Sequence, residues 1–172
     1  MTVHKVFVYG TLKCGEPNHH WLTDKSKGIA KYFCKAETVK NYPLVIGTKY
    51  NIPFLLDSPG CGNNVIGEVY EVDQPMLEQL DILEDHPNFY VRRIEDVRVM
   101  DNKEGLVINC WIYFLQNFKP GMLKQELFKE YSSSGPHGLK YLERCDVTQP
   151  TCTIETLLST SAQRFIGFSL WF

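Results

Sequence analysis

The order of its strand-like segments most constrains how this chain can fold. Runs rich in β-branched and aromatic residues predict strands at residues 3–9, about 28–39, 43–47, 65–72, 90–100 and 106–115. Helical periodicity is confined to residues 75–84 and about 121–131, with a short helical turn near residues 18–22. Because strands outnumber helices and do not alternate with them, we expect an α+β fold with a few packed helices, in which an antiparallel or mixed sheet curls toward a barrel. The polar turn at residues 101–105 should join two strands as a hairpin.

Size and charge narrow the classes of function. The chain has 172 residues, of which 44% are hydrophobic and 22% charged, and this suits one domain of ordinary size. We expect that domain at residues 1–145, followed by a C-terminal extension, residues 146–172, with no assigned role. A net charge of −2 and scattered Lys and Arg residues provide no basic field for nucleic acid. The apolar run at residues 165–172 is far shorter than the ~20 residues that span a bilayer. We therefore expect neither nucleic acid nor a membrane as a partner.

The N-terminal residues and the cysteines bear on the cellular compartment. The chain starts without the apolar stretch and cleavage site of a signal peptide, which favours a cytoplasmic protein. Its six cysteines form no C-x-x-C motif, and we interpret them as reduced thiols. Cys14 and Cys61 lie in Gly-containing loops, so thiol chemistry at one of them stays an alternative that replacing Cys14 with Ser would test.

The segment at residues 75–84 carries an acid in an unexpected place. Asp73 is a suitable cap and Pro75 suits a first helical turn. At about 100° per residue, one stripe of the helix contains the apolar residues Met76, Leu77, Leu80 and Leu83. Glu84 falls inside that stripe, where burial would raise the pKa of its carboxyl toward the range of a general base. If the helix ends at Leu83, however, Glu84 lies in a solvated loop, and periodicity alone does not decide between the two.

A Gly-containing turn follows the first predicted strand. Gly10 lets a ligand approach the backbone, and successive N–H groups in such a turn can hold a carboxylate or an oxyanion. Tyr9 and Thr11 add hydroxyl groups. A turn of this kind also occurs as a simple connection between elements.

The five histidines form no ligand cluster, and the chain carries no zinc spacing, nucleophile elbow or phosphate-binding loop, so we expect no metal and no cofactor.

Taken together, these segments resemble the gamma-glutamyl cyclotransferase-like family, and within it the gamma-glutamylamine cyclotransferases. The resemblance covers about residues 5–144 and rests on an ordered set of motifs: Val6-Phe7-Val8-Tyr9-Gly10-Thr11-Leu12-Lys13, Tyr42-Pro43-Leu44-Val45-Ile46, Asn51-Ile52-Pro53, Gly67-Glu68-Val69-Tyr70 and Gly135-Pro136-His137-Gly138-Leu139. It implies a barrel-like α+β fold. Residues 145–172 have no counterpart in the family pattern.

The resemblance also implies a reaction, the cleavage of a gamma-glutamyl amide into 5-oxoproline and a free amine without a metal. It makes Glu84 the catalytic acid–base and Tyr9, Gly10, Thr11 and Leu12 the substrate-binding loop. The implied substrate is gamma-glutamyl-ε-lysine, a remnant of transglutaminase crosslinks, with gamma-glutamyl α-amino acids as the alternative. We expect Tyr90, Tyr113 and Tyr141 to line the leaving-group pocket and the enzyme to act as a monomer. A noncatalytic module that binds a small ligand or a peptide end in the same cavity is the competing hypothesis.

Overall fold

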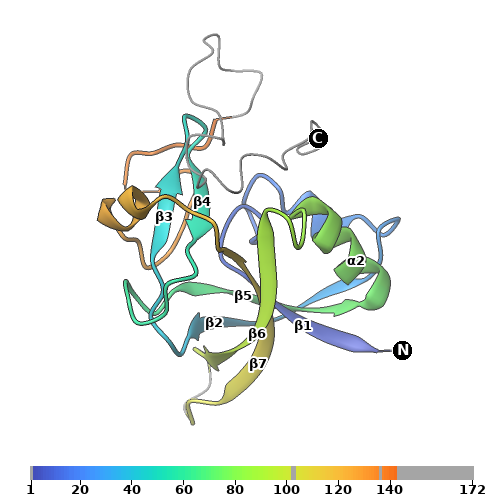
Figure 1. Ribbon diagram of the computed structural model, residues 1–172. Coiled ribbons are helices and arrows are strands. Elements are labelled where there is room, and N and C mark those ends of the chain that lie inside the picture. Colours follow the sequence, from blue (N-terminus) through green and yellow to red (C-terminus); the bar gives the residue numbers. More distant parts are fainter. Residues whose placement is uncertain (1, 102–103, 136, 143–172) are drawn as a thin grey trace.

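The centre of the molecule is a closed barrel of five strands, seen in a computed structural model that describes residues 2–101, 104–135 and 137–142 (Figure 1). Around the barrel the strands follow the order β1 (Val3–Val8), β5 (Ile66–Asp73), β2 (Ala30–Thr38), β6 (Tyr90–Val99) and β7 (Val107–Leu115). The expected α+β class with a curled sheet is confirmed. The C-terminal extension expected at residues 146–172 lies outside the described residues.

Strand β1 closes the barrel, and its second half, Val6–Val8, is buried on both faces. The strand pairs antiparallel with β5 and meets β7 in parallel, with Val6 opposite Trp111. Val6 and Val8 pack in one core cluster together with residues of helix α2 (Gln74–Leu83), whereas Phe7 packs in a second cluster to which all five barrel strands contribute. Burial on both faces explains why this half of the strand is apolar at every residue, without the alternation of a half-exposed strand.

The predicted hairpin is confirmed, because β6 and β7 pair antiparallel from Tyr90 opposite Leu115 to Arg98 opposite Val107. A shorter hairpin lies beside the barrel and consists of β3 (Leu44–Gly47) and β4 (Ile52–Leu55). The sequence did not indicate β4, since it has four residues and contains Pro53. Its position beside the barrel brings Pro53 into the functional site.

Helix α2 begins as its sequence indicates. The Asp73 side chain accepts hydrogen bonds from the N–H groups of Met76 and Ile29, both at 3.0 Å, which caps the helix and anchors the preceding loop. Met76, Leu77 and Leu80 are buried against the barrel. The short turn expected near residues 18–22 is helix α1 (His20–Thr23).

The helix predicted at residues 121–131 is wrong. A 3₁₀ helix spans Pro120–Lys124, and the chain beyond it is extended. Phe128 donates its N–H to the Leu44 carbonyl at 2.8 Å, and Lys129 accepts from the Ile66 N–H at 2.8 Å. These bonds add the segment to the edges of β3 and β5, so strand pairing in the tertiary structure outweighs local helix propensity.

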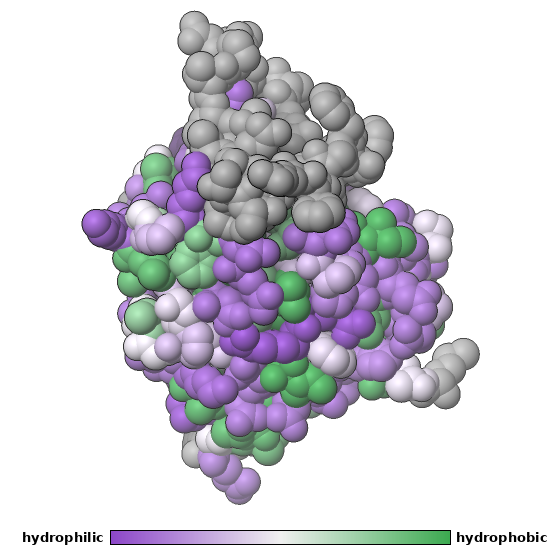
Figure 2. Space-filling view, viewed as in Figure 1, coloured by the Kyte–Doolittle hydropathy of each residue, from purple (hydrophilic) through white to green (hydrophobic). Residues whose placement is uncertain are grey.

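The surface in Figure 2 is largely hydrophilic, with apolar residues interspersed among polar ones. Among the described residues, no helix is long and apolar enough to cross a membrane.

Candidate functional site

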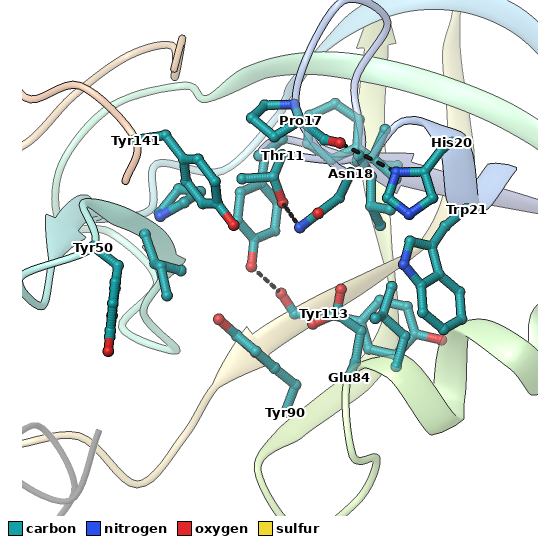
Figure 3. A pocket seen from close by; sticks show the side chains of 18 of the residues that line it. Thr11, Pro17, Asn18, His20, Trp21, Tyr50, Glu84, Tyr90, Tyr113 and Tyr141 are labelled. Carbon is teal, nitrogen blue, oxygen red and sulfur yellow. Dashed lines mark hydrogen bonds between the residues drawn. The ribbon is translucent and has the colours of Figure 1, made fainter. Parts of the chain in front are cut away.

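One cavity of about 430 Å³ opens between the end of β1, the β3–β4 hairpin, the end of α2 and the start of β6 (Figure 3). All eight residues that we predicted for the site line it: Tyr9, Gly10, Thr11, Leu12, Glu84, Tyr90, Tyr113 and Tyr141. Segments far apart in the sequence therefore meet at one hollow. Their proximity does not test the individual roles, which stay predictions.

Glu84 is the one carboxylate among the residues that line this cavity. Helix α2 ends at Leu83, so Glu84 is its C-cap residue, yet its carboxylate is partly buried and faces the cavity. The interpretation that the helix ends at Leu83 and the interpretation that Glu84 is withdrawn from solvent were therefore each partly right. Within the described part of the chain, the carboxylate has no hydrogen bond or ion pair. Burial raises the pKa of Glu84 to about 8, because the charged form loses hydration that no partner replaces.

The loop at residues 9–13, which we call the signature loop, presents donors to the cavity. Its carbonyl groups are occupied: Gly10 accepts from Lys13 N–H at 3.2 Å, Thr11 from Asn18 N–H at 2.9 Å, and Leu12 contacts His19 Nδ1 at 2.9 Å. The N–H groups of Gly10, Thr11 and Leu12 have no acceptor among the residues described. Buried N–H groups are normally paired, so this arrangement suits an anionic ligand group.

Gly10 is required by packing as well as by ligand access. A Cβ atom at this position would lie 2.7 Å from Cγ of Pro53, closer than real carbon atoms approach. Pro53 lies in β4, so the missing side chain lets the β3–β4 hairpin close one wall of the cavity. The physical role of Gly10 thus includes a contact that the sequence did not reveal.

The tyrosines beside Glu84 differ in what their hydroxyl groups do. Tyr9 donates to the backbone carbonyl of Tyr113 at 3.0 Å, and Tyr113 donates to Asp81 Oδ1 at 2.7 Å. Asp81 is in turn held by Arg92, with Nε to Oδ1 at 2.6 Å and Nη2 to Oδ2 at 3.0 Å. Burial raises the pKa of both tyrosines, and the nearby Glu84 raises it further. Tyr9 and Tyr113 are therefore fixed, protonated side chains in the wall of the cavity. Their hydroxyl protons are already donated to acceptors within the protein.

Several lining residues were missed by sequence reasoning. Pro17, Asn18, His20 and Trp21 lie on one side of the cavity, and Tyr50 lies on the other side with Tyr141 (Figure 3). Leu142 also lines the cavity. Tyr50 immediately precedes the Asn51-Ile52-Pro53 motif, so its position was a usable signal. Trp21 had no such signal, because it reaches the cavity only through the packing of α1. Cys14 and Cys61 are exposed, and neither lines this cavity, which leaves thiol chemistry without a place beside Glu84.

Charge is sparse in the cavity. Apart from Glu84, its titratable lining residues are His20 and five tyrosines, and the lining formed by described residues contains no Lys or Arg. An anionic group of a ligand can therefore be bound here by backbone N–H groups and hydroxyls, whereas the described lining offers no Lys or Arg side chain to pair with it.

Comparison with known proteins agrees with this geometry. The sequence model of the family "Gamma-glutamyl cyclotransferase, AIG2-like" matches residues 6–133. Gamma-glutamylaminecyclotransferase C of Danio rerio is 44% identical over 85% of this chain and 97% of its own. The gamma-glutamylaminecyclotransferase of Rattus norvegicus is 43% identical over 81% of this chain and 96% of its own. The crystal structure of an AIG2-like protein from Mus musculus superposes with a TM-score of 0.79 at 42% identity, covering 84% of this chain and 98% of that one.

Proposed function

Because the chain belongs to the AIG2-like gamma-glutamyl cyclotransferase family, we propose that it is a gamma-glutamylamine cyclotransferase, which converts a gamma-glutamyl amide into 5-oxoproline and a free amine. The observation that carries the proposal is the Glu84 carboxylate in an aromatic cavity beside three backbone N–H groups, all of them without a partner among the described residues. The names of the Danio rerio and Rattus norvegicus relatives support the same activity.

Glu84 supplies the acid–base chemistry in this proposal. The substrate's α-ammonium favours the ionised carboxylate when it binds beside Glu84, because opposite charges attract strongly in a desolvated site. Glu84 then takes a proton from the α-ammonium, which frees the nitrogen lone pair to attack the γ-carbonyl carbon. The second proton that this nitrogen loses on ring closure leaves with the amine product, which departs as an ammonium. The nucleophile and the carbonyl belong to one molecule and close a five-membered ring, so the protein needs to orient a single substrate. Glu84 returns the proton to the departing nitrogen as the amide C–N bond breaks.

The signature loop binds the other end of the glutamyl group. Three N–H groups in consecutive lining residues, none with an acceptor among the described residues, suit the two oxygens of the α-carboxylate, which is the permanent anion of the substrate. The carbonyl groups of the loop are occupied and do not repel it. The hydroxyl of Thr11, which accepts from Asn18 Nδ2 at 3.0 Å, retains its own proton for a further hydrogen bond.

The charge of the lining favours amines over α-amino acids as leaving groups. In a gamma-glutamyl α-amino acid, the carbon bonded to the scissile nitrogen carries a carboxylate. That carboxylate would lie close to Glu84, in a lining whose described residues supply no cation to pair with it. An alkylamine such as the ε-amine of lysine places methylene groups there, where the aromatic side chains of Trp21, Tyr50 and Tyr141 can contact them. This supports gamma-glutamyl-ε-lysine as the substrate and a role in degrading transglutaminase crosslinks.

The test is a panel of substrates that differ by one group. Gamma-glutamyl-ethylamine and gamma-glutamyl-alanine differ by a single carboxylate, and gamma-glutamyl-alaninamide replaces that carboxylate with a neutral group of similar size. We expect 5-oxoproline release to be fast for ethylamine, intermediate for alaninamide and slowest for alanine, with gamma-glutamyl-ε-lysine among the fast substrates. Saturable binding without release of 5-oxoproline from any of them would instead indicate a noncatalytic binding module.

Assembly and location belong to the same proposal. We propose that the enzyme acts as a monomer. Light scattering at the concentration of the assay tests this. We also propose a cytoplasmic location, supported by Cys14, Cys34, Cys61 and Cys110, which are free thiols as expected of a reducing compartment.

A further inference from the structure

Tyr90 differs from the two other tyrosines that surround Glu84. Its side chain is only 3% exposed, and its hydroxyl forms no hydrogen bond with any described residue. Tyr9 and Tyr113, in contrast, donate to protein acceptors. No polar side-chain atom in the described structure is both fully enclosed and unpaired, so the Tyr90 oxygen must reach open space. That space is the cavity, toward whose centre the Tyr90 side chain extends in Figure 3.

The Tyr90 ring is held too firmly to find a partner elsewhere. It stacks on Phe54 with the ring centroids 6.4 Å apart and meets Phe89 edge-on at 4.8 Å. Its backbone N–H donates to the Glu84 carbonyl at 3.2 Å, so the acid and the phenol are positioned by one short loop. An unpaired buried donor costs about 1–3 kcal/mol, and here a bound ligand can satisfy it.

We propose that the Tyr90 hydroxyl donates a hydrogen bond to the γ-carbonyl oxygen of the substrate and stabilises the oxyanion that forms as the ring closes. The proposal rests on the cyclotransferase function argued above. The bond from the α-nitrogen to the γ-carbon forms, the carbonyl electron pair moves to oxygen, and it returns as the leaving nitrogen departs. The proton that moves is the one carried by Glu84, while the phenolic proton stays on Tyr90.

Two observations favour the γ-oxygen over the α-carboxylate as the partner of Tyr90. The leaving nitrogen and the γ-oxygen are bonded to the same carbon, so a donor positioned together with Glu84 lies near that carbon. The α-carboxylate already has the three free N–H groups of the signature loop. Burial raises the pKa of Tyr90, and Tyr9 and Glu84 raise it further, so the phenol remains protonated as a donor throughout the neutral range.

Replacement of Tyr90 with Phe tests the proposal, with Tyr42→Phe as the matched control. Tyr42 is also fully buried, its hydroxyl accepts from Arg93 Nη2 at 3.2 Å, and it does not line the cavity. For Tyr90→Phe we expect kcat to fall about 10²- to 10³-fold with KM changed less than about threefold, as for the loss of one oxyanion donor. Tyr42→Phe should keep kcat within about twofold. Thermal unfolding should show Tyr90→Phe to be at least as stable as the parent, because it removes an unpaired hydroxyl.

Binding measurements separate transition-state from ground-state effects. In the non-turning-over Glu84→Gln background, adding Tyr90→Phe should change the Kd of gamma-glutamyl-ethylamine by less than about threefold. A kcat of Tyr90→Phe within threefold of the parent, or a loss that appears wholly in Kd, would overturn the role of Tyr90. If the parent itself releases no 5-oxoproline, the proposed function fails instead, so the two failures are distinguishable.

Discussion

Two hollows are lined in part by the segment from Tyr9 to Glu16, and they differ in how they use charge. The cavity holds one acid, Glu84, among aromatic rings. The second hollow, which we call the groove, has a volume of about 640 Å³, and its wall contains the acids Glu16, Glu68, Glu126 and Glu130 together with Lys13. The groove is thus far more charged than the cavity.

The groove nevertheless has the character of a structural region, because most of its charges have partners. Glu68 accepts from the Cys14 N–H and from the Tyr70 hydroxyl, both at 2.8 Å. Glu16 accepts from the Ser133 N–H at 2.9 Å. Glu84 has no such partner among the described residues, and burial alone perturbs it. The difference teaches that an acid becomes chemically useful through desolvation without pairing, and that the number of charges in a hollow is a poor guide to activity.

The largest expected effect is the difference in activity between a variant of the acid in the cavity and a variant of an acid in the groove. Glu84→Gln should lower kcat by about 10³- to 10⁵-fold while the fold and substrate binding persist, because the amide cannot carry the proton between the two nitrogens. Glu130→Gln, an exposed acid of the groove, should stay within about twofold of the parent. Release of 5-oxoproline measures both variants. Equal activity of Glu84→Gln and the parent would remove the role assigned to Glu84.

The same two variants should also differ in stability. Glu84→Gln should lose activity but gain stability relative to the parent. The pKa of Glu84 is about 8 when folded and 4.5 as its ordinary value, so each pH unit between these values costs the folded state about 1.4 kcal/mol. Glu84→Gln should therefore unfold with a free energy about 3 kcal/mol higher than the parent at pH 7. The gain should shrink to less than about 0.5 kcal/mol at pH 4.5, where the parent carboxyl is protonated in the folded state and half protonated in the unfolded state. Urea unfolding at the two pH values measures this, and a gain independent of pH would contradict the burial argument.

Activity should follow the ionisation of Glu84 and not that of the acids in the groove. The base must be ionised, so kcat/KM should fall about tenfold per pH unit below about pH 8 in the free enzyme. The limb for kcat should lie at lower pH, since the bound ammonium favours the carboxylate. Rate profiles from pH 5 to 9 with gamma-glutamyl-ethylamine measure both limbs. A kcat/KM limb near pH 4.5 would show that Glu84 is not perturbed.

The smallest expected effect concerns the groove as a support for the cavity. Lys13 is 6% exposed and donates to the Tyr131 carbonyl at 2.6 Å, which anchors the end of the signature loop. Lys13→Met should cost about 2 kcal/mol of stability, because that carbonyl loses its donor, and should raise KM through a looser loop. Lys5→Met, which removes an ion pair with Glu71 at 3.3 Å that is about one-third exposed, should cost less than about 0.5 kcal/mol. Equal costs in chemical denaturation would show that Lys13 is not an anchor.

Local sequence patterns predicted most of the fold. The β6–β7 hairpin, the capped start of α2 and the apolar character of β1 each follow from residues close together in the chain. The two errors have different causes. The chain around Phe128 owes its conformation to a bridge with the distant strand β3, whereas β4 pairs with its sequence neighbour β3 but is short and contains Pro53, so neither carries a strong local signal.

Some features of the candidate site likewise follow from the sequence, and others depend on the tertiary structure. The sequence by itself determined which residue types are present: a Gly-containing loop after a strand, an acid in an apolar helical stripe, and tyrosines on the following strands. Only the tertiary structure decided that Pro53 closes the wall against Gly10. It also decided that, within the described part of the chain, Glu84 at the end of α2 and the Tyr90 hydroxyl have no partner while the hydroxyls of Tyr9 and Tyr113 do. The physical reason is that burial and hydrogen-bond pairing depend on neighbours from distant parts of the chain, whereas periodicity and turn chemistry depend on neighbours in sequence.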